Sequence, residues 1–262
     1  MVDSGEISSP ARWDRTRSAA EVVPRAVGEF FGTTLDTLRT LPRRPFQFRE
    51  FVHQAWFIAN VSIVPTLLIA IPFCVMVIFQ INVLLNEIGA IDLSGAGAGI
   101  AVIREIGPVA TVLVVAGAGA TAICADLGAR TIREEIDAMR VLGIDPIHRL
   151  VVPRVLASTV VALFLNGLVT AVGLAGGYLY AVYLQGATPG QFITAIPLLT
   201  GIPDLLVSEL KAGIFGLLAA LVACHLGLHA KGGPKGVGDA VNQTVVFSFV
   251  LLFARPRTAV GW

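Results

Sequence analysis

The charged segment between Asp126 and Arg154 holds the residues whose types and spacing best suit a chemical role. Apolar Ile132, Ile136 and Met139 recur there at helical spacing, with charged residues of both signs between them. Both signs of charge around an apolar ridge suit a specific protein interface, whereas helices that bind membranes are usually one-sidedly basic. The segment is therefore a candidate docking element for a cytoplasmic partner, with an ordinary solvated connector as the alternative.

Residue types also mark the limits of this element. Gly143 suits a C-terminal helix cap, and Pro146 prevents the helix from continuing. The pattern predicts a helix over residues 131–142, in which Asp137 can pair with both Arg133 and Arg140. A helix of about three turns is not stable alone in water. It must pack on another part of the protein or on a partner.

Other motifs that suggest chemistry fail on inspection. The glycine-rich runs at 95–99 and 231–236 lack the Gly-Lys-Ser/Thr ending of a phosphate-binding loop. We therefore expect no directly bound cofactor, and any ATP and Mg²⁺ would be used by a partner. His225 and His229 have the i, i+4 spacing of metal ligands, but no third ligand is evident, so no metal site is predicted. The cysteines stand alone in apolar sequence, as buried small residues do: Cys74, Cys124 and Cys224.

Composition identifies the solvent in which these residues must be positioned. The chain has 262 residues, of which 55% are apolar and 14% charged, and its mean hydropathy is +0.78. A soluble globular chain carries about 25% charged residues, so lipid is the expected solvent. A net charge of +1 provides no overall field for nucleic acid, and no nucleic-acid partner is predicted.

Apolar runs predict an all-α, polytopic membrane bundle. A helix needs about 20 apolar residues to cross the hydrocarbon layer. Five stretches approach that length: Phe57 to Val83, Ile106 to Ala125, Val151 to Leu184, Leu205 to Leu228, and Thr244 onward. Four or six crossings remain open, since the third stretch is long for one helix and the last is short. A further short helix is expected in the loop between 186 and 204.

The segment before the first apolar stretch divides into two parts. Residues 1–21 are polar without periodicity, which predicts a disordered tail. Residues 22–55 contain an amphipathic helix over 23–41, expected to lie in the membrane interface, followed by a connector. Residues 56–262 form the predicted transmembrane domain.

The positions of arginine and lysine orient the bundle. Most lie in the N-terminal segment, in the loop 126–154 and after the fourth stretch, which five crossings place on one face. The opposite face has few: Arg104, Lys211, Arg255 and Arg257. The positive-inside rule makes the first face cytoplasmic. We therefore expect a multi-pass protein of the inner membrane with a cytoplasmic N-terminus and a periplasmic C-terminus.

Polar residues in or near the apolar stretches are candidates for a substrate path or a partner contact. They are Glu105, Asn166, Glu209 and Lys211. Burying a polar group in lipid costs free energy, so polar residues at these positions are candidates for a functional role. The alternatives are an interhelical hydrogen bond for Asn166 and an interfacial ion pair for Glu209 and Lys211. Gly173 and Gly177 have the spacing that lets helices approach closely, within the bundle or between subunits.

Four sequence blocks together resemble the MlaE/YrbE family of ABC-transporter permeases. They are Arg104-Glu-Ile-Gly-Pro-Val109, Ala125-Asp-Leu-Gly128, Arg133-Glu-Glu-Ile-Asp-Ala-Met-Arg-Val-Leu-Gly-Ile-Asp-Pro146 and Val152-Pro-Arg-Val-Leu-Ala157. The resemblance extends over residues 25–250 and is strongest to YrbE permeases of mycobacterial Mce lipid-transport systems. Two features depart from the family: 116–120 lacks a glycine-arginine pair common in the second span, and the last apolar run is short.

The resemblance implies a function for the charged segment. It would be a coupling helix that inserts into a cytoplasmic ABC ATPase, through residues Arg133, Glu134, Glu135, Asp137, Ala138, Met139, Arg140, Leu142 and Gly143. It also implies pairing with a second, homologous permease, as a heterodimer, beneath periplasmic Mce proteins. The cargo would be a hydrophobic lipid, fatty or mycolic acid before sterol, and import of fatty acid is the expected activity.

Two other functional classes fit the residues less well. An ion-coupled secondary transporter or a channel normally shows charged groups at mid-span or inverted repeats, and neither is clear here. A membrane enzyme would need a nucleophile, base and acid close together, and no such cluster stands out. The chain is therefore predicted to be a transport subunit without catalytic residues, and co-purification of an ATPase would distinguish it from the other classes.

Overall fold

The computed structural model describes residues 28–41 and 47–253, and every regular element in these ranges is a helix. A first helix covers residues 28–40. The elements that follow are α2 (Phe48–Glu87), η1 (Ile91–Leu93), α3 (Ser94–Gly99), η2 (Ile100–Ile106), α4 (Gly107–Val114), η3 (Val115–Ala120), α5 (Thr121–Ile132), α6 (Glu135–Val141), η4 (Ile147–Val151), α7 (Val152–Gln185), α8 (Pro189–Leu199), α9 (Ile202–Leu228) and α10 (Gly233–Phe253). The predicted all-α bundle is confirmed. The predicted tail at 1–21 and the C-terminal residues 254–262 lie outside the described ranges.

Four helices of the described chain are long and apolar enough to cross a membrane: Phe48–Glu87, Ile91–Ile132, Ile147–Gln185 and Ile202–Leu228. They contain the first four predicted stretches. The fifth begins within α10, which is not among the four because its first half is rich in glycine and polar residues. Whatever follows Phe253 lies outside the described residues.

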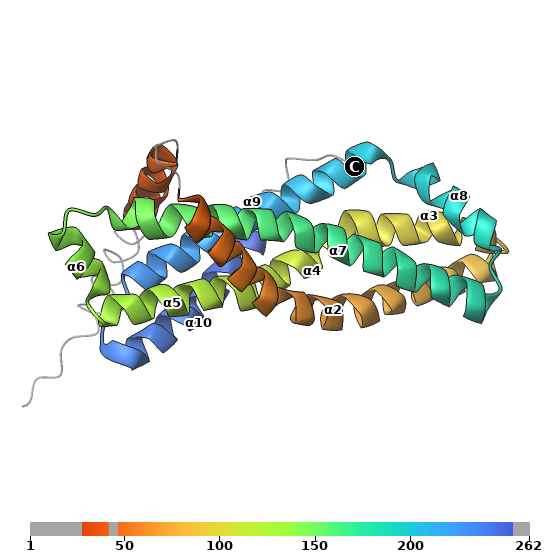
Figure 1. Ribbon diagram of the computed structural model, residues 1–262. Helices are drawn as coiled ribbons and strands as arrows, with labels where there is room; N and C mark the ends of the chain where they lie inside the picture. Colours follow the sequence, from red (N-terminus) through yellow and green to blue (C-terminus); the bar gives the residue numbers. More distant parts are fainter. Residues whose placement is uncertain (1–27, 42–46, 254–262) are drawn as a thin grey trace, which may run out of the picture.

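The helices run back and forth along one long axis (Figure 1). Helix 28–40, α6 and the turn between α9 and α10 lie at one end, called here the α6 end. Elements η1 and α8 lie at the other, called here the α8 end. The chain thus brings the end of helix 28–40, the start of α2, the basic segment 130–154 and the turn between α9 and α10 toward the same end.

The second membrane helix is not a regular α-helix. Two π-helical segments, η2 and η3, interrupt it, and a third, η4, precedes α7. Segments of π-helix are often found at functional sites. The sequence-based limits of 106–125 were too narrow. The helix also includes the small residues of α3 and the charged residues of η2 before these limits, and the charged end of α5 after them.

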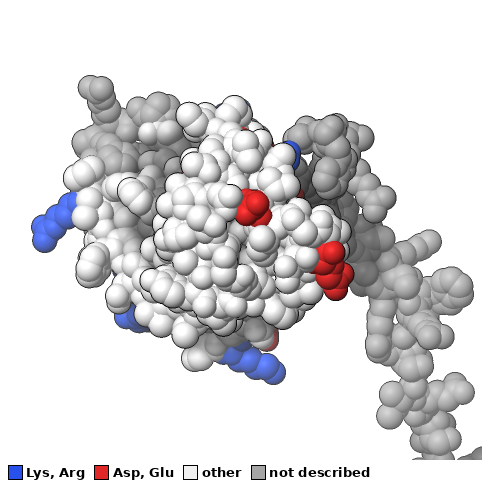
Figure 2. Space-filling model, turned by 90° about the vertical axis from the view of Figure 1, so that its right-hand side faces the viewer, with Lys and Arg blue, Asp and Glu red and all other residues white. Residues whose placement is uncertain are grey.

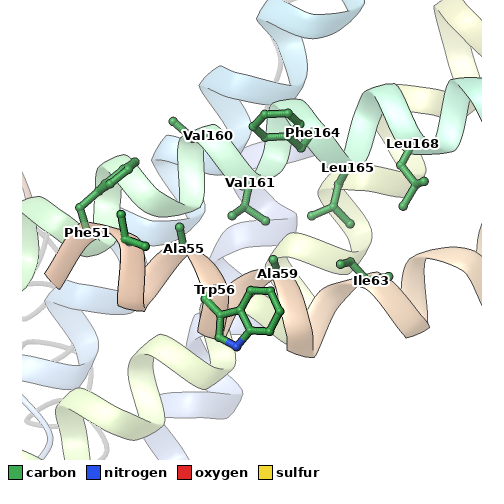
Figure 3. Close-up of a pocket in the computed structure, with 11 residues that line it drawn as sticks. Phe51, Ala55, Trp56, Ala59, Ile63, Val160, Val161, Phe164, Leu165 and Leu168 are labelled. Atoms are coloured by element: carbon green, nitrogen blue, oxygen red, sulfur yellow. The ribbon is translucent and has the colours of Figure 1, made fainter. Parts of the chain in front are cut away.

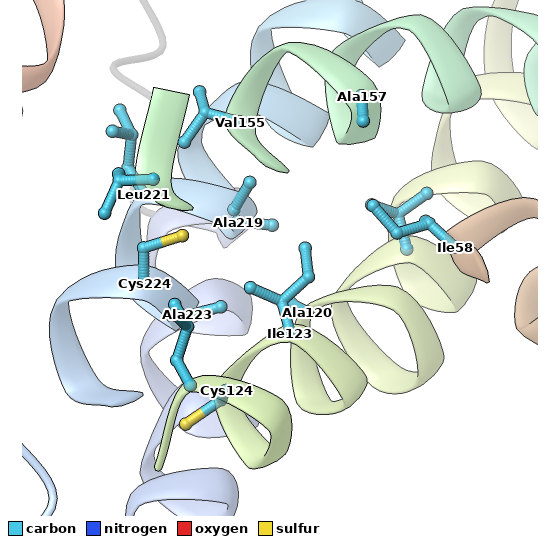
Figure 4. Packing of buried hydrophobic residues seen from close by; sticks show 14 of the residues in the cluster. Ile58, Ala120, Ile123, Cys124, Val155, Ala157, Ala219, Leu221, Ala223 and Cys224 are labelled. Carbon is cyan, nitrogen blue, oxygen red and sulfur yellow. The ribbon is translucent and has the colours of Figure 1, made fainter. Parts of the chain in front are cut away.

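Two apolar clusters fill the bundle. The cluster at the α6 end joins α2, α5, α7 and α9 and includes the buried cysteines Cys124 and Cys224 (Figure 4). The cluster toward the α8 end joins α2, α3, α7 and α8. There Gly173 and Gly177 face Cys74 and Ile78 of α2 so closely that an added methyl group would clash. These glycines therefore serve the packing of the bundle itself.

The first helix fits an interfacial position. Its apolar side chains Phe31, Leu35 and Leu38 are exposed, whereas Thr37 and Thr40 are buried. A water-soluble protein would bury the apolar side instead, so the exposed apolar face suits contact with lipid. The short helix expected between 186 and 204 is confirmed as α8, and its Phe192 is buried against Tyr178 at 5.6 Å between ring centroids.

Candidate functional site: the α6 connector

The predicted helix 131–142 is broken into two parts, so its expected continuity was wrong. Thr131 and Ile132 end α5, a turn follows at Arg133 and Glu134, and α6 covers only Glu135–Val141. Glu134 has φ of 59°, the left-handed region that non-glycine residues rarely adopt. Just before this turn, the end of α5 is bonded to α9, because the Thr131 hydroxyl donates to the Gly227 carbonyl at 3.0 Å. The change of direction therefore takes place within two residues.

The predicted stop after α6 is confirmed. Gly143 has φ of 74°, and its N–H donates to the Arg140 carbonyl at 3.0 Å. The N–H of Ile144 donates to the Met139 carbonyl at 2.9 Å, which completes a Schellman-type cap. Pro146 then precedes η4. Both ends of α6 are thus defined by backbone geometry.

The faces of α6 differ from the expected ones. Ile136 is buried and Met139 is half-buried, and both pack on the cluster at the α6 end. The outward side carries exposed Ala138, Val141 and Leu142, the last two with 88% and 73% of their surface exposed. The ridge available to a partner is therefore Ala138, Val141 and Leu142, called here the α6 ridge. Val141 was not among the residues predicted for docking, although its i, i+3 spacing from Ala138 places both on one side of a helix.

Charged residues flank the α6 ridge. Asp137 and Arg140 form the expected ion pair at 3.0 Å, and both are largely exposed. The expected pair of Arg133 with Asp137 is absent from the described contacts; Arg133 instead lies 3.5 Å from Glu135. The turn at Glu134 takes Arg133 off the α6 helix, which explains the exchange of partners. An apolar strip between both signs of charge can dock a complementary protein surface.

A series of ion pairs leads from α6 into the bundle. Arg130 Nη1 lies 3.9 Å from Glu135 Oε2, and Arg130 Nε lies 3.3 Å from Asp126 Oδ1. The other oxygen of Asp126 accepts a hydrogen bond from Arg154, whose side chain is completely buried. The sequence pattern marked Asp126 and Arg154 only as limits of the charged segment. Asp126 directly follows one predicted apolar stretch, and Arg154 lies near the start of the next. A charge at each of these two positions was the signal that could have identified the pair.

The polar residues predicted for the substrate path do not form one cluster. Asn166 is buried, and its amide donates to Ser208 of α9 at 3.0 Å. The alternative expected for Asn166, a hydrogen bond between two helices, is therefore confirmed. Glu209 lies beside Asn166 and is half-buried. Glu105 is exposed and Lys211 is half-buried, and the described ion pairs include neither. The ion pair at this level is Arg104 with Asp204, 3.3 Å apart.

An apolar groove of about 510 Å³ lies between α2 and α7. Trp56, Ala59 and Ile63 of α2 face Phe164 and Leu168 of α7 across it (Figure 3). All residues that line it are apolar or aromatic. Such a groove offers contact to an alkyl chain but no hydrogen bond to a polar headgroup.

The histidine pair joins two helices. Nδ1 of His225 lies 3.0 Å from the hydroxyl of Thr33 in helix 28–40, and Phe30 packs edge-on against the same ring. His229 contacts the His225 carbonyl at 2.8 Å. The described residues contain no group of three or more His, Cys, Asp or Glu side chains placed to hold a metal ion. His225 thus joins helix 28–40 to α9.

Comparison with known proteins assigns the family. The family model described as "Permease MlaE" matches residues 51–255, from α2 past the end of α10. The chain belongs to the MlaE permease family. A "Probable ABC transporter permease protein" of Synechocystis sp. is 35% identical over 63% of this chain and 63% of its own length. A Rickettsia bellii protein of the same printed name is 27% identical over 87% of this chain and 88% of its own length.

A plant protein is also similar to this MlaE-family chain. "Protein TRIGALACTOSYLDIACYLGLYCEROL 1, chloroplastic" of Arabidopsis thaliana is 35% identical over 57% of this chain and 43% of its own length. The chain therefore spans under two thirds of the cyanobacterial and plant relatives that it matches. Elements η1 to α10, including α6, and the groove between α2 and α7 lie within the stretch that the family model matches.

Proposed function

We propose that this chain is the membrane subunit of an ATP-driven ABC transporter and that the α6 ridge docks on its ATPase. The observation that carries the proposal is the exposure of Val141 and Leu142 between Asp137 and Arg140, on a helix anchored by its other face. Exposed apolar side chains with charged neighbours suit a buried, specific contact. The relatives named as ABC transporter permeases support the same reading.

The energy source would then be separate from this chain. Its glycine-rich segments lack the ending of a phosphate-binding loop, so ATP and Mg²⁺ belong to the partner. In this arrangement the α6 end is cytoplasmic and the α8 end periplasmic, with the chain in the inner membrane. The grouping of basic segments at the α6 end supports this orientation.

The proposed cargo is a lipid. The groove between α2 and α7 can hold an alkyl chain, and the printed name of the plant relative refers to a galactolipid. Within the resemblance to the Mce-associated YrbE permeases, a fatty or mycolic acid is the first choice and a sterol the second. The complete machine would contain a second, homologous permease and periplasmic Mce proteins.

Four polar residues are proposed to meet the headgroup or a partner near the α8 end. Asn166 keeps an amide oxygen without a partner among the described residues, and the Glu209 carboxylate lies beside it. Glu105 adds a negative charge and Lys211 a positive charge, and neither residue belongs to a described ion pair. A lipid headgroup with both donors and acceptors would satisfy such a set.

Docking is tested by Val141→Glu in the full chain, purified from membranes with its partners. A carboxylate at the centre of the α6 ridge should weaken retention of the ATPase at least about tenfold. Ile88→Glu is the matched control, because Ile88 is 69% exposed beside the end of α2, away from α6. Equal ATPase retention in the two variants would refute the docking proposal. Mass spectrometry of lipid retained by the purified complex tests the cargo, and retained sterol without fatty acid would move the assignment to the second choice.

A further inference from the structure

Arg154 carries a charge into the interior of the bundle. Its side chain has no exposed surface, although it lies at the start of α7 close to the α6 end. Nη1 donates to the Leu150 carbonyl at 2.9 Å, and Nη2 pairs with Asp126 of α5. Burying a charge is costly unless it is paired, so this guanidinium depends on Asp126.

The pair continues outward with alternating charges. Asp126 contacts Arg130, Arg130 contacts Glu135, and Glu135 contacts Arg133. Exposure of the side chains rises along this ion-pair chain, from 0% at Arg154 to 33% at Arg130 and 65% at Arg133. The ion-pair chain therefore connects the first residue of α6 to the interior between two membrane helices.

The segments before and after α6 both contact the side chain of Arg154. Asp126 lies in α5, before α6, and Leu150 lies in η4, after it; Arg154 contacts both. A displacement of α6 must therefore change these contacts or move α5 and α7 with it. Nε of Arg154 is buried and has no hydrogen-bond partner among the described residues. A donor left unsatisfied in this arrangement favours a second arrangement in which it is paired.

We propose that the Arg154–Asp126 pair is a coupling joint that passes movement of α6 to α5 and α7. The inference rests on the proposed ATPase docking. Arg154 and Asp126 are positioning residues in it, since neither touches nucleotide or cargo. Hydrogen bonds and ion pairs with fixed geometry transmit displacement between rigid helices better than a flexible loop does.

The test follows a reporter at the α8 end, so it needs no knowledge of the cargo. Leu184→Cys adds an exposed thiol near the end of α7, whereas the natural cysteines are buried. In the full complex with its ATPase, maleimide labelling of this thiol should change when ATP and vanadate are added. Arg130→Gln breaks the ion-pair chain at a half-exposed position and should reduce that change about fivefold while the ATPase stays bound.

Arg149→Gln is the matched control. Arg149 is exposed at the same end and is not part of the ion-pair chain, so its loss should leave the nucleotide response unchanged. An equal response in the Arg130 and Arg149 variants, or no nucleotide response in the parent complex, would overturn the coupling joint. Failure of the docking proposal is distinct, because the parent chain would then not retain an ATPase at all.

A second variant separates coupling from stability. Asp126→Asn combined with Arg154→Gln removes both charges of the pair and leaves groups that can hydrogen-bond, so the Tm should stay near the parent value. The reporter response should nevertheless remain low. Recovery of the response together with the Tm would mean that the pair only stabilises the fold, which contradicts the proposal. If the double variant does not fold, the comparison of Arg130 with Arg149 decides alone.

Discussion

The two ends of the molecule handle polar groups differently. At the α6 end charges are paired in sequence, from Arg133 to the buried Arg154. The α8 end, viewed in Figure 2, is mostly uncharged, with isolated acidic groups. Toward that end, side-chain atoms of Asn82, Ser94 and Gln185 are buried without hydrogen-bond partners among the described residues.

The difference suits the two proposed tasks. An end that receives force from a protein partner needs side chains held in fixed positions, which paired charges and a capped helix provide. An end that meets a lipid or a variable partner can leave polar atoms open until that partner binds. The comparison therefore predicts that changes at the α6 end act on stability and coupling, whereas changes at the α8 end act on binding.

The largest expected effect comes from removing the partner of the buried Arg154. Asp126→Ala leaves Arg154 charged and completely buried, so the free energy of unfolding should fall by about 3 kcal/mol. Arg104→Ala is the counterpart toward the α8 end, because it removes the ion pair and leaves the Asp204 cap of α9 intact. Arg104 is 47% exposed, so the loss should stay below about 1 kcal/mol. Thermal unfolding of the purified variants measures both, and similar Tm values would contradict the contrast between the ends.

A smaller effect separates two buried asparagines. Asn166→Leu removes the donor to Ser208 and should lower stability by about 1 kcal/mol. Asn82→Leu removes an amide whose described atoms have no partner, so stability should hold or rise by about 1 kcal/mol. Thermal unfolding again gives the measurement. A comparable loss in both variants would show that Asn82 has a bound partner, such as a lipid or another subunit.

Features that depend on local pattern could be predicted from the sequence. The four long apolar helices follow from runs of apolar residues, and the stop after α6 follows from Gly143 and Pro146. Helix α8 follows from its apolar residues between two prolines. Each of these depends on neighbours within one or two helical turns, which the sequence displays directly.

Features that depend on distant contacts could not be predicted. Arg154 and Asp126 are 28 positions apart, and only the folded bundle brings them together. The break at Glu134 comes directly after Thr131 and Ile132, and the Thr131 hydroxyl donates to Gly227 on another membrane helix. Without that anchor the helical periodicity through residues 131–142 favours one continuous helix. The outward ridge was misassigned for the same reason, since the rotation of α6 follows from the turn.

The smallest expected effect tests how this turn is held. Glu134→Gly relieves a left-handed conformation worth roughly 1–2 kcal/mol, but glycine also adds about 0.4–1 kcal/mol of freedom to the unfolded chain. The net gain should therefore be about 0.5 kcal/mol. Gly143→Ala is the opposite change, because a methyl group at φ of 74° should cost about 1 kcal/mol. Hydrogen exchange of the α6 amides measures both.

The expected order is slower exchange in the Glu134 variant and faster exchange in the Gly143 variant. Faster exchange after Glu134→Gly would mean that the glutamate side chain itself holds the turn, and not the anchor between Thr131 and Gly227. In that case Thr131→Val, which replaces the hydroxyl with a methyl group, should leave α6 exchange unchanged. If the anchor holds the turn, Thr131→Val instead speeds exchange throughout α6, because the end of α5 loses its hydrogen bond to α9.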